Sequence, residues 1–270
     1  MLRFCANVST LFTDRPLLQR FDAARAAGFT AVEMQFPYAE PAESLAEALR
    51  DSGLTLQLHN LPPGDWAAGE RGMASHPDRV AEFRQGVERA LHYARALGTP
   101  RLHCLSGIAP SGVPAAEARA TLVANLRHAA AAVAAHGLVL LVEPLNLHDV
   151  PGYTLSTVDD AIDLMAEVGA PNLQLQYDLY HQQRMRGELI GTLRTHRPRI
   201  GHIQLADNPG RGEPGTGEVA WRAVLTAIEH SGYAGWVGLE YFPLDKGPRG
   251  TEAGLAWLAA HGRDATGKTT

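Results

Sequence analysis

The sequence predicts a single-domain (β/α)8 barrel. Short apolar runs alternate with amphipathic stretches eight times along the 270 residues, which is the pattern of strands followed by helices. About 250 residues is typical of such a barrel, whereas a doubly wound sheet rarely needs eight strands in a chain of this length. No linker or change of composition divides the chain. Glycines that can end a helix in the left-handed conformation recur after the helical stretches: Gly28, Gly53, Gly98, Gly137, Gly169 and Gly232.

The predicted strands and helices follow from these two kinds of run, taken in chain order. The short apolar runs predict strands near residues 3–7, 31–34, 54–59, 101–105, 138–142, 173–177, 200–203 and 236–239. The amphipathic runs between them predict helices near residues 17–27, 41–52, 79–97, 115–136, 158–168, 183–195, 221–231 and 250–261. We therefore expect the barrel to span residues 1–261, followed by a flexible polar tail at 262–270.

The composition is that of an ordinary globular protein, with 45% hydrophobic and 20% charged residues. The formal net charge of −5 argues against a nucleic-acid partner, which would favour a basic face. No apolar run approaches the roughly 20 residues that cross a bilayer, and the amino terminus enters a strand without a signal-peptide core. Cys5 and Cys104 lie in strand-like runs, where reduced core thiols are expected. These features predict a cytoplasmic protein with no membrane partner.

Four predicted strands are each followed by a side chain that offers an oxygen ligand: Glu143, Asp178, Gln204 and Glu240. The carboxyl ends of the strands of such a barrel converge on one face, where the chemistry of these folds is found. Carboxylate and amide oxygens favour Mg²⁺ or Mn²⁺ over zinc. Each acid alone could instead cap the following helix or pair with an arginine. The repetition over four consecutive units favours a metal site.

Two of these residues, Glu143 and Glu240, suit general acid–base catalysis. We expect the fifth and eighth strands to face each other across the barrel, so that the two carboxylates flank a small molecule. One carboxylate would remove a proton from a carbon next to a carbonyl, and the other would return a proton to the neighbouring carbon or to the opposite face. A divalent ion would stabilise the enediolate formed between these steps.

Four histidines lie close to the predicted site. His181 follows Asp178 by three residues, and His59 closes the third strand, so both are candidates for substrate binding. His103 lies within the fourth strand, where a structural role is the simpler interpretation. His202 alternates with Gln204 and is expected to line the barrel interior below the metal.

Two long loops on the same face carry further candidate residues. Residues 60–78 include Trp66, which either belongs to a lid over the substrate or packs in a small cluster of the loop itself. Residues 206–218 are rich in glycine and proline and contain Arg211, whose planar fork suits a carboxylate of an anionic substrate. The alternative for Arg211 is a surface ion pair with Glu213 or Asp207. No dinucleotide fingerprint or P-loop occurs, so no nucleotide cofactor is expected.

Five runs resemble the hydroxypyruvate isomerase family: LLVEPLN (140–146), QYDLYH (176–181), GHIQLAD (201–207), PGRGEPGTGE (209–218) and GLEY (238–241). That family belongs to the xylose-isomerase-like barrels, together with ketose 3-epimerases and inosose dehydratases. The resemblance covers about residues 2–261. It implies that Glu143 and Glu240 are the catalytic pair and that Glu143, Asp178, Gln204 and Glu240 hold a metal. The related epimerases usually carry histidine at the position of Gln204, which favours the hydroxypyruvate isomerase branch.

The resemblance implies an isomerase that interconverts hydroxypyruvate and 2-hydroxy-3-oxopropanoate, or that acts on a related small anionic 2-oxo acid. A four-carbon 2-oxo sugar acid (2-oxotetronate) and a ketose substrate for 3-epimerisation stay open as alternatives. Outside the isomerases, a metal-dependent DNA-repair endonuclease or a non-catalytic ligand-binding barrel would share the fold. Whether the chain forms a homo-oligomer is also open.

Overall fold

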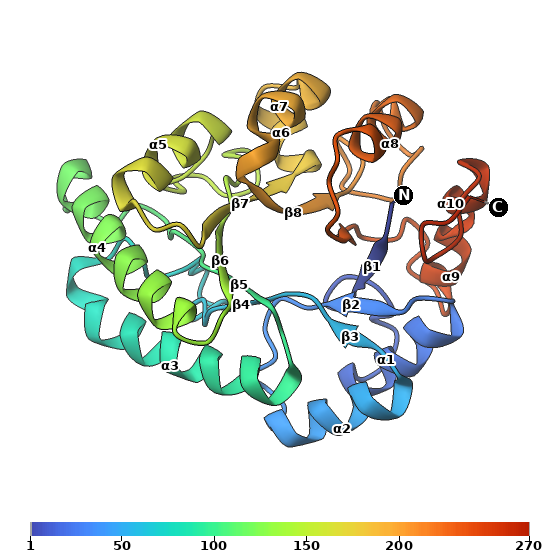
Figure 1. The fold of residues 1–270 in the computed structure, drawn as a ribbon, viewed down its shortest axis with the longest axis horizontal. Coiled ribbons are helices and arrows are strands. Elements are labelled where there is room, and N and C mark those ends of the chain that lie inside the picture. The colour runs from blue at the N-terminus through green and yellow to red at the C-terminus, as the bar shows by residue number, and fades with distance from the viewer. Residues whose placement is uncertain (1, 270) are drawn as a thin grey trace.

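The computed structural model describes residues 2–269, in which helices surround a ring of parallel strands (Figure 1). The strands are β1 (Phe4–Asn7), β2 (Ala31–Glu33), β3 (Thr55–Leu56), β4 (His59–Asn60), β5 (Arg101–His103), β6 (Val139–Val142), β7 (Leu173–Asp178), β8 (Ile200–Leu205) and β9 (Val237–Leu239). The α-helices are α1 (Leu17–Ala26), α2 (Ala42–Ser52), α3 (Val80–Leu97), α4 (Ala115–Ala134), α5 (Val158–Val168), α6 (Leu179–Met185), α7 (Leu189–His196), α8 (Trp221–His230), α9 (Gly250–Gly254) and α10 (Ala256–Ala260). Two 3-10 turns, η1 (Pro77–Arg79) and η2 (Arg197–Arg199), precede α3 and β8.

The strands form one sheet in the order β3-β2-β1-β9-β8-β7-β6-β5-β4, and every pair is parallel. The two end strands, β3 and β4, are consecutive in the chain. Between them the Gln57 amide donates to the carbonyl of Val32 at 2.8 Å, and the Met34 amide donates to the carbonyl of Leu58 at 3.1 Å. Thus β3 and β4 are two parts of one third strand, and the sheet closes. This arrangement confirms the predicted (β/α)8 barrel.

Two helices that the sequence predicts as single are divided. The stretch 183–195 was expected as one helix, but α6 begins earlier, at Leu179, because the Asp178 side chain accepts a hydrogen bond from the Tyr180 amide and caps it. The chain then breaks at Gly187 and Glu188, both with positive φ, before α7 begins. The last predicted helix, 250–261, is likewise divided into α9 and α10.

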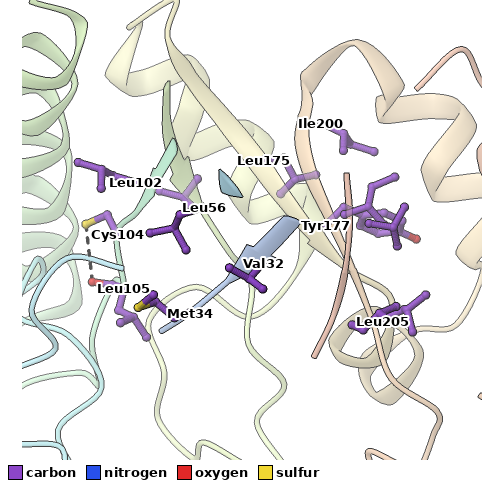
Figure 2. Close-up of a cluster of buried hydrophobic side chains, with 14 of the residues drawn as sticks. Val32, Met34, Leu56, Leu102, Cys104, Leu105, Leu175, Tyr177, Ile200 and Leu205 are labelled. Carbon is purple, nitrogen blue, oxygen red and sulfur yellow. Dashed lines mark hydrogen bonds between the residues drawn. The ribbon is translucent and has the colours of Figure 1, made fainter. Parts of the chain in front are cut away.

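An apolar layer fills the space between the strands and the helices. Figure 2 shows part of it, including Val32, Leu56, Leu102 and Leu175, which come from four different strands. Alternation along each strand puts every second residue into this layer and its neighbours into the barrel interior. The interior of the barrel is polar near its carboxyl end, so the same alternation that builds the core also assembles the site.

Residues after α10 pack against the amino-terminal part of the barrel. Arg263 and Thr269 form an antiparallel bridge, and Ala265 is buried beside Gly28. The flexibility expected for the tail stays a prediction, and Thr270 lies outside the described residues. Within residues 2–269, no helix combines the length and the apolar content needed to span a membrane.

Candidate active site

A cavity of about 380 Å³ opens at the carboxyl ends of the strands. This volume suits a small molecule. Most of the predicted site residues line it: Glu143, Gln204, Glu240, His181, Arg211 and Trp66. Asp178 lies next to this group, with its Oδ2 3.6 Å from Arg211 Nη2. A larger, more open groove of about 890 Å³ lies along α7 and α8, but no carboxylate is among its described lining residues, so the chemistry belongs to the smaller cavity.

The two glutamates of the predicted acid–base pair do not face each other across the whole barrel. Glu143 follows β6 and Glu240 follows β9, and only β7 and β8 separate these strands in the sheet. Diametrically opposite strands of an eight-stranded barrel are four positions apart, whereas β6 and β9 are three apart. The expectation of opposite strands was therefore wrong. The carboxyl-terminal opening of the barrel is called the mouth here. Both glutamates lie on the half of the mouth that also holds Asp178 and Gln204.

The three carboxylates of the mouth have raised pKa values because they are buried close together. Burial raises the pKa of Glu143 well above its ordinary value, and Asp178 and Glu240 raise it further. Burial also raises the pKa of Asp178. The pKa of Glu240 is about 7, because burial outweighs the opposing effect of Arg211. All three carboxyl groups of this site therefore hold their protons more tightly than ordinary carboxyl groups do.

Arg211 points into the acidic mouth instead of forming a surface ion pair. Its Nη2 lies 3.3 Å from Glu240 Oε1 and 3.6 Å from Asp178 Oδ2. The guanidinium also stacks near the rings of Tyr180, at 5.1 Å, and Phe242, at 5.9 Å. The alternative pairing with Glu213 or Asp207 was wrong, because Glu213 accepts the Leu244 amide while Asp207 organises its own loop. Contact of Arg211 with an anionic substrate stays a prediction.

His181 is held as a hydrogen-bond donor toward the acids. The Asn146 backbone amide donates to His181 Nδ1 at 3.1 Å, so Nδ1 is an acceptor and the proton of the neutral ring lies on Nε2. Nε2 is 3.7 Å from Asp178 Oδ2. Burial lowers the pKa of His181 well below its ordinary value, which keeps the ring neutral. This tautomer suits a donor to a substrate oxygen, the role expected from the sequence.

The orientation of the Gln204 amide follows from its two partners. Gln204 Nε2 donates to Glu33 Oε1 at 2.7 Å, because a charged carboxylate can only accept. Gln204 Oε1 therefore turns the other way and accepts from Gln176 Nε2 at 2.6 Å. The amide oxygen, which is the atom that a hard cation would bind, is the one directed away from Glu33.

Glu33 is the main residue that sequence reasoning missed. It is fully buried and accepts from Asn7 Nδ2 at 3.0 Å, from His202 at 2.6 Å and from Cys5 Sγ at 3.5 Å, in addition to Gln204. Burial acts to raise the pKa of Glu33, but His202, Gln204 and Asn7 outweigh it and lower the pKa. The signal was present, because Glu33 ends a strand as the other acids do. His202 lies in the barrel interior, as predicted.

His59 is the one predicted site residue that the structure places away from both the cavity and the other site residues. Its side chain is buried toward α3, where Nε2 lies 3.3 Å from the carbonyl oxygen of Ala90. The neighbours in alternation, Leu58 and Asn60, line the cavity instead. Since side chains alternate along a strand, His59 points to the outside of the barrel. His103, by contrast, lines the cavity, with Nε2 3.6 Å from Glu143 Oε2.

The residues at the mouth fit a divalent cation. Within residues 2–269, Glu143 Oε1 and Asp178 Oδ2 are buried with no hydrogen-bond partner. Ligand atoms of Glu143, Asp178 and His181 lie within 4.8 Å of one another. Buried, unpartnered carboxylate oxygens with raised pKa values are the environment in which a bound cation relieves mutual repulsion.

The chain belongs to the family described as the xylose isomerase-like TIM barrel, whose model it matches over residues 21–261. It is 49% identical to hydroxypyruvate isomerase of Escherichia coli (strain K12) over 258 residues, which cover 96% of this chain and 98% of that protein. It is 45% identical to 2-oxo-tetronate isomerase of Cupriavidus necator, with the same coverage. These relatives show that the chain is an isomerase.

A solved structure has nearly the same backbone. The crystal structure of AP endonuclease, family 2, from Brucella melitensis superposes with a TM-score of 0.92 and 45% sequence identity, covering 98% of this chain and 100% of that one. The barrel and its connections are therefore shared along almost the whole chain.

Proposed function

We propose that this isomerase interconverts hydroxypyruvate and 2-hydroxy-3-oxopropanoate. The observation that carries the proposal is the pair Glu143 and Glu240, both buried in one cavity and both with raised pKa values. A proton shift between adjacent carbons needs one group that accepts a proton and one that donates, with pKa values near the working pH. The similarity to hydroxypyruvate isomerase of Escherichia coli supports this substrate.

In the proposed reaction one glutamate removes a proton from C3 of hydroxypyruvate, which gives an enediolate with its negative charge on the C2 oxygen. The other glutamate returns a proton to C2. The hydroxyl proton on C3 moves to the C2 oxygen as C3 becomes the aldehyde, so atoms and charge balance. His181 Nε2–H donates to a substrate oxygen, and Arg211 limits the repulsion between Glu240 and Asp178. The hydrogen bond from His181 stabilises the negative charge that develops on the substrate oxygen of the enediolate.

We propose that Glu143, Asp178, Gln204 and Glu240 would hold Mg²⁺ or Mn²⁺. Such an ion supplies Lewis acidity toward neighbouring substrate oxygens when it is bound. The oxygen-only donor set supports this choice of ion, as does Gln204 Oε1, which is directed away from Glu33 and accepts a hydrogen bond from Gln176. The proposed partner is a small anionic 2-oxo acid, with no nucleic acid and no membrane, in the cytoplasm. Homo-oligomerisation stays open.

A second candidate is isomerisation of 2-oxotetronate, favoured by the 45% identity to 2-oxo-tetronate isomerase of Cupriavidus necator. This substrate has one more carbon and the same reacting group, so the same glutamates would serve both reactions. The neighbour from Brucella melitensis is described as an AP endonuclease, family 2. DNA cleavage would need a basic approach to the site, whereas Glu143, Asp178 and Glu240 give this mouth an acidic lining.

The test is isomerisation of hydroxypyruvate by the purified protein, followed by proton NMR in D₂O. The expected result is an aldehyde product carrying solvent deuterium on C2, with loss of rate in EDTA and recovery with Mg²⁺ or Mn²⁺. The same assay with a four-carbon 2-oxo sugar acid ranks the second candidate by kcat/KM. Absence of turnover on hydroxypyruvate with either metal would reject the proposed substrate.

A further inference from the structure

Arg71 is a second arginine in the cavity, and it has no acidic partner. It lines the cavity together with Trp66. Its Nη1 donates to the backbone carbonyls of Trp66, at 3.2 Å, and Glu70, at 2.7 Å. In the part of the chain that the structure describes, no carboxylate lies within ion-pair distance of its guanidinium. The cavity therefore contains a cation whose charge is not neutralised.

The carboxylate nearest in sequence, Glu70, is already engaged. Its Oε1 pairs with Arg79 Nη1 at 2.6 Å, and its Oε2 accepts the Asp65 amide at 2.5 Å. The Arg79 guanidinium also binds Glu82, at 2.8 Å, at the start of α3. These contacts tie the loop of residues 60–78 to α3 and prevent Glu70 from turning toward Arg71.

The backbone next to Arg71 is fixed against the barrel. The Gly72 amide donates to the carbonyl of Pro63 at 2.8 Å. Gly72 has a φ of 110°, and a Cβ there would collide with the carbonyl of Leu105, so only glycine allows this approach. The Arg71 guanidinium lies over the Trp66 ring, with Cζ 3.8 Å from the ring centroid, and Phe36 packs on the same indole at 5.0 Å between ring centroids. The guanidinium is thus held in place before any ligand binds.

The charges of the cavity are unevenly distributed. One end of it holds Glu143 and Glu240, with Asp178 beside them, and Arg211 pairs with both Glu240 and Asp178. The three carboxylates outnumber the one guanidinium here, and Asp149 adds a further carboxylate to the cavity lining, so this end offers a substrate carboxylate no net attraction. Arg71 offers a full positive charge with a free edge for a bidentate contact.

We propose that Arg71, stacked on Trp66, binds the carboxylate of the 2-oxo acid and selects acids over neutral ketoses. This inference deepens the proposed function and rests on it. The substrate would lie with its carboxylate at Arg71 and its reacting carbons at Glu143 and Glu240. Arg211 would then act on the acids of the mouth and not on the substrate carboxylate.

The test compares Arg71→Met and Arg71→Lys with wild type on three probes. Hydroxypyruvate reports KM and kcat, pyruvate reports Kd by calorimetry because it lacks the hydroxyl that reacts, and dihydroxyacetone replaces the carboxylate by a neutral hydroxymethyl group. For Arg71→Met we expect an increase of about 30-fold in the KM of hydroxypyruvate and the Kd of pyruvate, with kcat and the affinity for dihydroxyacetone within about 3-fold of wild type. Arg71→Lys should recover part of the affinity, since it keeps the charge but not the fork.

Two control variants make the result specific. Arg84→Met removes an exposed arginine of α3 and should match wild type on all three probes. Arg211→Met should change the KM of hydroxypyruvate and the affinity for dihydroxyacetone to a similar degree. The assignment of Arg71 is wrong if the Kd of pyruvate for Arg71→Met lies within 3-fold of wild type, or if the variant loses as much affinity for dihydroxyacetone as for pyruvate. It is also wrong if the wild-type protein binds no pyruvate. If the wild-type protein binds pyruvate through Arg71 but does not isomerise hydroxypyruvate, the proposed function fails while the assignment of Arg71 stands.

Discussion

Glu143 and Glu240 are deeply buried, and the proton-transfer role that we propose for them requires that each can gain and lose a proton. Burial raises the pKa of both carboxyl groups, which makes each a better proton acceptor than an ordinary carboxylate. Their amide counterparts have nearly the same shape but cannot carry or accept the proton. Substitution by glutamine therefore separates catalysis from folding.

For Glu143→Gln and for Glu240→Gln we predict a loss of kcat of at least about 10³-fold on the substrate of the wild-type enzyme. The thermal midpoint of the metal-free protein should stay the same or rise, because each change removes a buried carboxylate next to others. Steady-state kinetics and thermal unfolding measure the two effects. A near-wild-type rate in either variant would refute the two-carboxylate mechanism.

The raised pKa of Glu240 also predicts a pH-dependent stability of the metal-free protein. The pKa is about 7 in the folded protein and 4.5 for the ordinary group, so the folded state binds the proton more tightly. The free energy of unfolding should therefore fall as pH rises from about 4.5 to about 7, by about 1.4 kcal/mol for each unit of pKa difference.

Urea unfolding in EDTA at pH 5 and pH 8 measures this difference. Comparison with Glu240→Gln cancels the contributions of groups that do not interact with Glu240, and the variant should lose less stability over the same interval than wild type. If both proteins show the same dependence, Glu240 does not titrate in this range.

At the level of elements, the loop after β8 is organised by the buried carboxylate of Asp207. Its two oxygens accept from the amides of Asn208 (2.9 Å), Gly215 (2.8 Å) and Val219 (3.2 Å), and from Trp221 Nε1 (2.9 Å) at the start of α8. One side chain therefore fixes both ends of the loop that carries Arg211.

We predict that Asp207→Asn lowers the free energy of unfolding by about 2 kcal/mol, because an NH₂ group would face N–H donors where a carboxylate oxygen now accepts. The variant should also lose kcat/KM, since Arg211 depends on this loop. Chemical denaturation measures the first effect, with Asp51→Asn on the exposed face of α2 as the control. Equal stability of the two variants would contradict the organising role of Asp207.

The sequence predicts strands and simple helices better than it predicts breaks. Glycine directly after an apolar face marks the ends of α2 and α3, where Gly53 and Gly98 both have a φ of 66°. The break between α6 and α7 also carries this glycine signal, at Gly187 with a φ of 67°. The start of α6 has no such signal, because it depends on the Asp178 side chain accepting a hydrogen bond from the Tyr180 amide. Such caps depend on tertiary position, which periodicity does not contain.

For the whole molecule, the site shows the same contrast between residues that regular strands place and residues that depend on tertiary structure. The convergence of strand ends on one face of a barrel correctly predicted that Glu143, Asp178, Gln204 and Glu240 lie together. It did so because a barrel brings strand ends together whatever the conformation of its loops. It could not decide the side to which a residue points where a strand is interrupted, and His59 lies outside the cavity for that reason. Arg71 comes from an irregular loop, where no period exists to indicate which residue returns to the mouth.

The overall charge gives a further prediction for the whole molecule. With a net charge of −5 and an acidic mouth, we expect no retardation of duplex DNA containing an abasic site at physiological ionic strength, and no cleavage of it with Mg²⁺, Mn²⁺ or Zn²⁺. A gel-shift assay over a range of salt concentrations measures this. Specific cleavage would favour the endonuclease activity named for the Brucella melitensis neighbour.

The bare Cα of Gly238 leaves the space that the Glu33 carboxylate occupies, since a Cβ there would overlap it. The residues beneath the cavity therefore depend on one another. Substitution of one of them removes either a hydrogen-bond donor to Glu33 or the space that the Glu33 carboxylate occupies. The rim of the cavity is different, because it includes partly exposed residues such as Phe242 that can be substituted with less effect on their neighbours. Adaptation to new substrates should therefore accumulate at the rim while the residues beneath the cavity stay unaltered. A mutant library intended to broaden the substrate range belongs in the loops of residues 60–78 and 207–217, with Gly72 and Asp207 kept unchanged.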